Sequence, residues 1–185
     1  MLDFIKSSRE ENIYYGDIFK LDGKGFLVFG SGKTQAMREA VNESANPENE
    51  IALDMACITK ENDKVFGHFE MPIRGKGIED PIKNKIQIHY FINMLQEKST
   101  KEIFKTSTPA IVEVEYNDFI HLSGFNIGFS TDMLENPLKT NPKLRVEKFK
   151  QLTEGTLIKC YAIPWMNSEI EKGQLVRNYF YENIN

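Results

Sequence analysis

The feature that most constrains the fold of this chain is a hairpin-and-helix pattern near its beginning. Residues 12–20 and 25–29 read as two strands, and Asp22-Gly23 between them is a strong two-residue turn signal because both turn positions require positive φ. The second strand runs straight into Gly30-Ser31-Gly32, and apolar residues then recur at helical spacing over residues 34–43. The pattern predicts a helix that packs closely on the strand before it.

The remaining segments predict further helices and strands. Helices are predicted over residues 48–59, 81–98 and 144–152, and strands over residues 64–73, 110–116, 125–129 and 156–163. The segment 167–181 fits either a helix or a strand. These elements predict one α+β domain over residues 1–185, with largely antiparallel sheets layered with three to five helices and a sub-boundary near residues 74–80.

Charge and cysteine usage narrow the classes of function. The formal net charge of -4 gives no general attraction to nucleic acid or anionic lipid, and no segment is apolar enough for a signal peptide or a membrane span. We therefore expect a cytoplasmic protein.

Cys57 and Cys160 lie in apolar runs far apart in sequence, which favours two buried reduced thiols. The excess of Lys, Ile and Asn over Arg and Ala is typical of a phage or a low-GC bacterium.

The glycine turn between the second strand and the helix invites comparison with a phosphate-binding loop. The candidate anion-binding residues are Gly30, Ser31, Gly32, Lys33 and Thr34. A complete phosphate loop has a further glycine where this chain has Leu27, and the strand leaves no loop to wrap a phosphate. We therefore do not expect a nucleoside triphosphatase. The backbone amides at the start of the helix still offer a place for an anion.

The same stretch resembles the second half of proteasome-type N-terminal-nucleophile hydrolase subunits. The resemblance covers residues 17–57 and depends on the hairpin that ends in Gly30-Ser31-Gly32, on the helix over residues 35–41, and on the segment 51–56. In that family a Gly-Ser-Gly turn leads into the first of two helices that pack on a sheet. The resemblance implies that Ser31 corresponds to a serine near the catalytic threonine.

This resemblance implies a shared substructure without the family's catalytic half. The family's nucleophile is the first residue of the mature chain, and its free amine is the base. Here the turn comes at residue 30, and neither Met1 nor Leu2 has a nucleophilic side chain. The resemblance therefore implies a partial relative that binds or assembles, or a hydrolase that another chain completes.

Histidines supply the alternative enzymatic hypothesis. His121-Leu-Ser123 matches half of a two-histidine phosphoesterase signature, with His68 as the second histidine; in such enzymes one histidine is the base and the other the acid. The weak catalytic candidates are therefore His68, His121 and Ser123. A metal site that combines these histidines with Glu70 and His89 is geometrically conceivable, but their spacing does not require it. We expect no metal and no cofactor.

The sequence as a whole favours binding over catalysis. Trp165 and Met166, just beyond a predicted strand, are the candidate protein-contact residues because Trp and Met are enriched in interface cores. A Trp at the edge of the core is the competing interpretation. The leading hypothesis is a non-enzymatic module that binds a protein partner or self-associates, with no nucleic-acid and no membrane partner.

Overall fold

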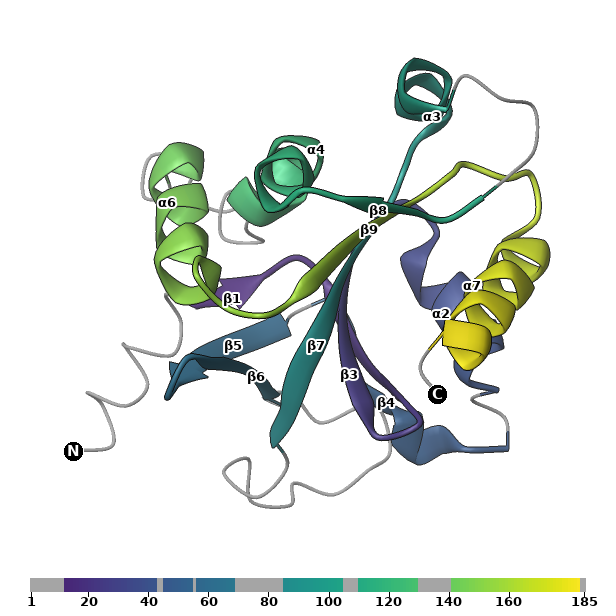
Figure 1. The fold of residues 1–185 in the computed structure, drawn as a ribbon, viewed down its shortest axis with the longest axis horizontal. Helices are drawn as coiled ribbons and strands as arrows, with labels where there is room; N and C mark the ends of the chain where they lie inside the picture. The colour runs from purple at the N-terminus through teal and green to yellow at the C-terminus, as the bar shows by residue number, and fades with distance from the viewer. Residues whose placement is uncertain are drawn as a thin grey trace.

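The computed structural model of this chain describes residues 12–42, 45–54, 56–68, 85–104, 110–129 and 141–183. Within these ranges nine strands form one curled sheet (Figure 1). The strands are β1 (Ile13–Tyr14), β2 (Asp17–Leu21), β3 (Lys24–Gly30), β4 (Glu50–Ala52), β5 (Ala56–Glu61), β6 (Lys64–His68), β7 (Lys85–Met94), β8 (Val112–Val114) and β9 (Lys159–Ile163). Their order is β1-β5-β6-β7-β3-β2-β4, and β9 pairs with both β7 and β8.

Most strand pairs are antiparallel, but the centre of the sheet is parallel. β3 and β9 both run parallel to β7, and the other six pairings are antiparallel. The described α-helices are α2 (Lys33–Val41), α3 (Glu97–Ile103), α4 (Tyr116–Gly128), α6 (Pro142–Thr153) and α7 (Glu169–Asn183). The predicted fold class, α+β with largely antiparallel strands and three to five helices, is confirmed.

The helices cover the two faces of the sheet and form two hydrophobic cores. α4 and α6 lie on one side in Figure 1, and α2 and α7 lie on the other. On β3, Leu27 and Phe29 belong to the first core, whereas Phe26 and Val28 belong to the second, and all four are fully buried. Alternate residues of a strand point to opposite faces, so β3 holds both cores together. Full burial of each such side chain contributes about 1.5–3 kcal/mol.

The opening pattern of the sequence folds as predicted. β2 and β3 form the hairpin, and Asp22 and Gly23 have φ values of 48° and 74°, as a turn with two positive φ angles requires. α2 follows β3 directly, and the four residues of its apolar stripe are buried. The strands β6 and β9 also form within the segments predicted for them, and α6 includes the helix predicted over residues 144–152 and extends past both of its ends.

The helix predicted over residues 81–98 is wrong in the part that the structure describes. Residues 85–94 form β7, the central strand of the sheet. It pairs with β6, β3 and β9. Ile88 and Phe91 belong to the first core and Ile92 and Met94 to the second, so apolar residues occupy both of its faces. A continuous apolar run cannot distinguish a doubly buried strand from a buried helix, and the β-branched and aromatic residues here favour the strand. The proposed sub-boundary near residues 74–80 lies outside the described residues.

The helix predicted over residues 48–59 is also wrong. Its residues form a short 3-10 helix η1 (Pro47–Asn49), β4 and β5. β4 extends the sheet beside β2, and β5 pairs with β1 and β6. The second helix of the pair in the hydrolase resemblance is therefore not formed.

The strand predicted over residues 125–129 is also wrong. Phe125 and Ile127 belong to α4, and Phe129 is its C-cap. Ile127 is fully buried, whereas Phe125 is 79% exposed, so their side chains do not share a face. Alternation over three apolar residues is too short to establish a period of two.

Three further segments have bounds or types that the sequence did not predict in full. α6 begins at Asn141-Pro142, two residues before the predicted start: the Asn141 side chain accepts hydrogen bonds from the amides of Lys143 and Leu144, and Pro142 occupies the first turn. The undecided segment 167–181 forms most of α7. β8 covers only Val112–Val114 of the strand predicted over residues 110–116, because α4 begins at Tyr116.

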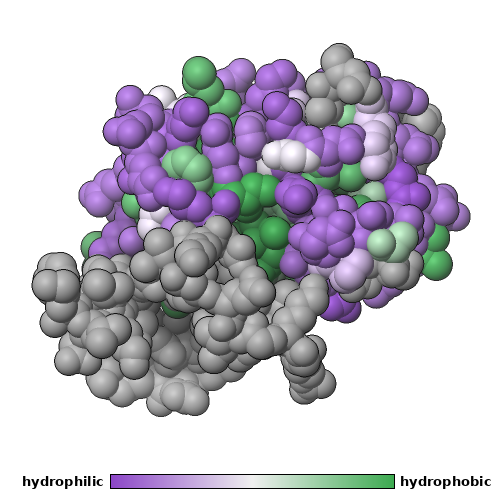
Figure 2. Space-filling view, turned by 90° about the horizontal axis from the view of Figure 1, so that it is seen from below, coloured by the Kyte–Doolittle hydropathy of each residue, from purple (hydrophilic) through white to green (hydrophobic). Residues whose placement is uncertain are grey.

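The thiols and the surface complete the description. Cys57 and Cys160 are buried and free, as predicted. Among the described residues, no helix has the length and apolar character that crossing a membrane would require. Figure 2 views the molecule from below Figure 1, where hydrophobic atoms gather near the middle of a mainly hydrophilic face.

Candidate functional site

A cavity of about 870 Å³ lies at the carboxyl ends of β3 and β7, where α2 begins. These two parallel strands end side by side, with Gly30 paired to Met94. The residues that line the cavity come from the β1–β2 connection, the end of β3, the start of α2, the segment after β4, the end of β7, α3 and α4: Tyr15, Gly30, Ser31, Gly32, Lys33, Thr34, Gln35, Asp54, Asn93, Met94, Leu95, Gln96, Ser99, Leu122, Phe125 and Asn126. The carboxyl ends of parallel strands are a common place for ligand sites in open sheets that contain such strands.

The glycine turn depends on two positions without side chains. Gly30 has φ 102°, and a Cβ there would lie 2.0 Å from the carbonyl oxygen of Met94. The amide of Ser31 donates to that same carbonyl at 3.3 Å. Gly32 is the N-cap of α2 in the left-handed conformation, with φ 69°. These positions allow the chain to leave β3 and enter α2 within two residues.

The start of α2 presents backbone donors to the cavity. Ala36 donates the first helical hydrogen bond, to the carbonyl of Gly32 at 3.2 Å, so the amides of residues 33–35 precede it. The N-cap has no side-chain hydrogen bond and the first turn of α2 itself carries no acidic residue, while Glu169 of α7 lies against Gly32. Free amides at the positive end of a helix dipole favour a negatively charged partner.

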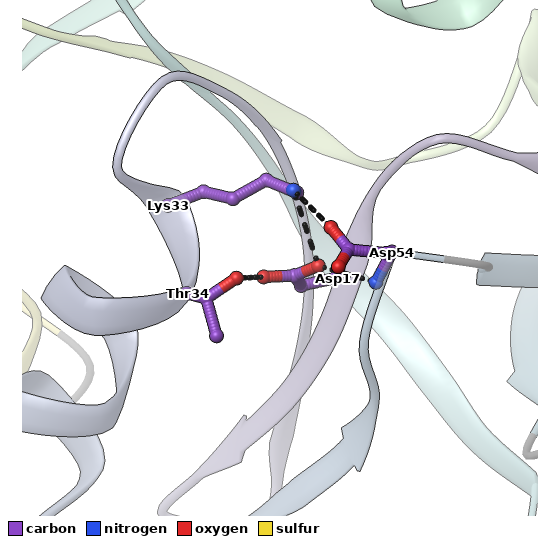
Figure 3. A network of polar contacts seen from close by, with 4 residues as sticks. All are labelled: Asp17, Lys33, Thr34 and Asp54. Atoms are coloured by element: carbon purple, nitrogen blue, oxygen red, sulfur yellow. Dashed lines mark hydrogen bonds and ion pairs between the residues drawn. The ribbon is translucent and has the colours of Figure 1, made fainter.

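A buried ion network lies beneath this turn (Figure 3). The Lys33 ammonium is 2.8 Å from Asp54 Oδ1 and 3.4 Å from Asp17 Oδ1. Asp17 Oδ2 accepts a 2.6 Å hydrogen bond from the Thr34 hydroxyl, and Asp17 Oδ1 accepts one of 2.7 Å from the Asp54 amide. Asp17 is fully buried and the Lys33 side chain is 6% exposed, whereas the Asp54 side chain is 58% exposed.

Burial and pairing act in opposite directions on these two charges. Burial raises the pKa of Asp17 above its usual value, and the contacts with Lys33, Thr34 and the Asp54 amide oppose that rise. Burial also disfavours the charged form of Lys33, but the two carboxylates raise its pKa above the ordinary value. Lys33 therefore remains an ammonium at neutral pH, held at the cavity by its partners.

The part of the cavity wall that comes from α4 combines two apolar side chains with one amide. Leu122, Phe125 and Asn126 lie on one face of this helix at spacings of three and four residues. Tyr15 lines the cavity between this face and α2, and the Lys33 ammonium lies 4.4 Å from the centroid of its ring. The site is thus polar at α2 and aromatic at α4.

The predicted anion-binding residues all line this cavity, while the two carboxylates that pair with Lys33 were not predicted. Gly30, Ser31, Gly32, Lys33 and Thr34 are in its wall. Anion binding by these residues stays a prediction. Asp17 and Asp54 were missed because their contacts with Lys33 join residues far apart in sequence. The available signal was the carboxylate of Asp17 at the start of a strand that is otherwise apolar except for Lys20.

The residues of the phosphoesterase hypothesis lie on two different kinds of element. His68 is on β6, and its Nε2 is 2.6 Å from the hydroxyl of Thr59. His121 and Ser123 are on α4, not on a strand as the signature requires. His121 is exposed, whereas Ser123 is fully buried, so the helix turns the two side chains to different surroundings.

The remaining sequence candidates lie elsewhere. His89 is on β7, and its Nδ1 accepts a 3.2 Å hydrogen bond from the amide of Gly25. Glu70 lies outside the described residues, within which no group of three or more metal-ligating side chains occurs. Trp165 is 37% exposed and its amide donates to the Thr100 hydroxyl, while Met166 is half-buried.

The similarity of this chain to known proteins is limited to a distant structural likeness. No protein-family model matches this chain, and no curated protein matches it. Among solved structures, the Hpr(Ser) kinase/phosphatase from Coxiella burnetii is similar over 94% of this chain and 99% of that chain, with a TM-score of 0.48 and 15% identity. Similarity at this level shows nothing about the ligand or activity of this chain.

The resemblance to proteasome-type N-terminal-nucleophile hydrolases is wrong. Within the chain, the segment expected to supply the second packed helix forms η1, β4 and β5. The Gly-Ser-Gly turn was not a specific sign of the hydrolase family, because a short strand–turn–helix unit occurs in many unrelated folds.

Proposed function

We propose that this chain binds a small phosphate-bearing ligand, together with a divalent cation, in the cavity at the start of α2. The observation that carries the proposal is the convergence on one cavity of the buried Lys33 ammonium, the glycine turn and the uncapped first turn of α2. Backbone amides at a helix start and a lysine are suitable donors to phosphate oxygens. The volume falls within the range of about 300–1,000 Å³ typical of small-molecule sites.

The charges around Lys33 favour a phosphate that carries a cation. Two carboxylates face one ammonium, so the cluster would repel a bare anion. The Asp54 side chain is more than half exposed and lines the cavity, where a carboxylate oxygen is a suitable ligand for Mg²⁺. When Asp54 turns to a cation, the Lys33 ammonium gains a free donor for a phosphate oxygen.

The binding or assembly role expected from the sequence stays a prediction. Its support is the partly exposed Trp165, which does not identify a partner. The two-histidine phosphoesterase hypothesis loses support because His121 and Ser123 belong to a helix. The cavity is therefore the better starting point for an experiment.

Calorimetric titration with magnesium tripolyphosphate tests the proposal, with Gln35→Glu as the diagnostic variant. Gln35 is exposed and lines the cavity in the first turn of α2, where a carboxylate suits the helix dipole but repels phosphate. We expect one bound ligand per chain and about tenfold weaker binding in Gln35→Glu, a loss typical of one added charge nearby. Gln151→Glu, an identical change at an exposed position of α6, should bind like the wild type.

Three results would contradict the proposal. Absence of binding at millimolar ligand would remove it. Equal weakening by Gln35→Glu and Gln151→Glu would indicate non-specific attraction. Equal or tighter binding of tripolyphosphate without Mg²⁺ would show that the cation has no part in the site.

A further inference from the structure

We propose that the ligand of this cavity carries a planar aromatic ring remote from its phosphate, and that this ring stacks on Phe125. This inference rests on the proposed function and extends it from a phosphate ester to a nucleotide. Phe125 belongs to α4 and lines the cavity, yet its side chain is 79% exposed. A single exposed apolar side chain is ordinary, but one in the wall of a polar cavity offers a ring to a ligand.

The geometry of Phe125 suits stacking on its open side. Its ring stacks on Phe129 with centroids 5.9 Å apart and an interplanar angle of 29°. Phe129 therefore supports one side of the ring, and the exposure shows that the rest is open. Such a supported ring is held in place before a ligand arrives, which lowers the entropy cost of stacking.

A chain of ring contacts joins Phe125 to the phosphate end of the cavity. Phe129 contacts Tyr15 edge-on, with centroids 5.2 Å apart, and the Lys33 ammonium lies 4.4 Å from the centroid of the Tyr15 ring. The four residues form a path of contacts from an exposed aromatic ring to a buried ammonium. A ligand with phosphate at one end and an aromatic ring at the other would match both ends.

Asn126 suggests that the ring has polar edges. Asn126 lies beside Phe125 on α4 and also lines the cavity. Its side-chain amide can both donate and accept hydrogen bonds. A nucleobase combines a stacking face with donors and acceptors along its edge, whereas a purely hydrocarbon ring would leave this amide unpaired. Nucleotides therefore match the chemistry of this end of the cavity.

Comparison of magnesium ATP with magnesium tripolyphosphate tests the inference, because the two share their phosphates and differ in the nucleoside. We expect ATP to bind at least about tenfold more tightly, as one stacked base allows. Phe125→Ala should remove that advantage and leave tripolyphosphate binding unchanged, while Phe125→Trp should retain it. Leu157→Ala, at a fully exposed residue outside the cavity lining, is the matched control.

The outcomes separate the two proposals. If neither ligand binds, the proposed function fails and the inference fails with it. If both bind with equal affinity, or if Phe125→Ala retains the advantage of ATP, the phosphate site stands and the aromatic subsite is wrong. Circular dichroism of Phe125→Ala should match the wild type, because the side chain is mostly exposed.

Discussion

At the scale of single residues, the carboxylate of Asp17 is held by burial and by several contacts. It is fully buried, and both of its oxygens accept hydrogen bonds, from the Thr34 hydroxyl and the Asp54 amide. A buried carboxylate is tolerated only when it is paired and hydrogen-bonded. The carboxylate therefore fixes the positions of β2, the start of α2 and the segment after β4 relative to one another.

Replacement of Thr34 by valine tests the importance of this bond. Thr34→Val keeps the shape of the side chain but removes the donor to Asp17, so we expect a loss of about 1–3 kcal/mol in the free energy of unfolding. Urea denaturation measures this loss. Thr156→Val is the control: its hydroxyl donates to a carbonyl that also accepts from the Thr156 amide, and it should cost less. Equal losses in the two variants would show that Asp17 does not need the Thr34 bond.

At the scale of secondary-structure elements, the contact between α2 and α7 supports the cavity. α7 packs along α2 through Gly173, where a Cβ would lie 2.5 Å from the Ala36 carbonyl oxygen. Arg177 of α7 donates from Nε to the carbonyl of Ala40 at 2.8 Å. Glu169 of α7 lies against Gly32, the N-cap of α2. α7 thereby contacts both ends of the helix that begins at the cavity.

A matched pair of glycine substitutions tests this packing. Gly173→Ala should destabilise the protein because the new methyl group meets backbone of α2, which has little room to move. Gly124→Ala, in α4, adds the same group where no atom lies within 4 Å and should stabilise by roughly 0.5–1 kcal/mol through helix propensity. Guanidinium denaturation measures both. Stabilisation by Gly173→Ala would mean that the two helices lie further apart than described.

At the scale of the whole molecule, two cores on opposite faces of one sheet bury several ionisable groups. Cys160 of β9 is an example: burial, and to a smaller degree Glu113 and Glu115, raise the pKa of its thiol to about 12. Burial also raises the pKa of the Tyr116 hydroxyl to about 12. Such groups stay neutral in the folded protein and ionise more readily in the unfolded chain, so stability present at neutral pH is lost as pH rises.

The pH dependence of Cys160→Ala tests this effect. The contribution of the thiol is fully present below pH 9, its ordinary pKa, and is lost as the pH rises towards about 12. Above pH 9 the gap in unfolding free energy between the wild type and Cys160→Ala should therefore shrink by about 1.4 kcal/mol per pH unit. Thermal denaturation from pH 8 to 10.5 measures it. Val65→Ala, a core change without a titratable group, should keep a constant gap; a constant gap for Cys160→Ala would contradict the burial of an ionisable thiol.

The elements that the sequence predicted correctly are those with strong local signals. The β2–β3 hairpin follows from Asp22-Gly23, and α2 follows from its apolar stripe. The error at β7 occurred because burial on both faces hid the period: its apolar residues belong to the two cores on opposite faces of the sheet. No local pattern reports such burial.

The candidate site likewise has one part that local sequence predicted and one part that it did not. The sequence by itself determined the glycine turn, the lysine that follows it and the start of α2, because consecutive residues set backbone geometry and helix capping. Only the tertiary structure decided that Asp17 and Asp54 pair with Lys33, and that Phe125 of α4 faces the same cavity. The physical reason is that ion pairs and cavity walls join residues brought together by packing, across separations that no short-range pattern spans.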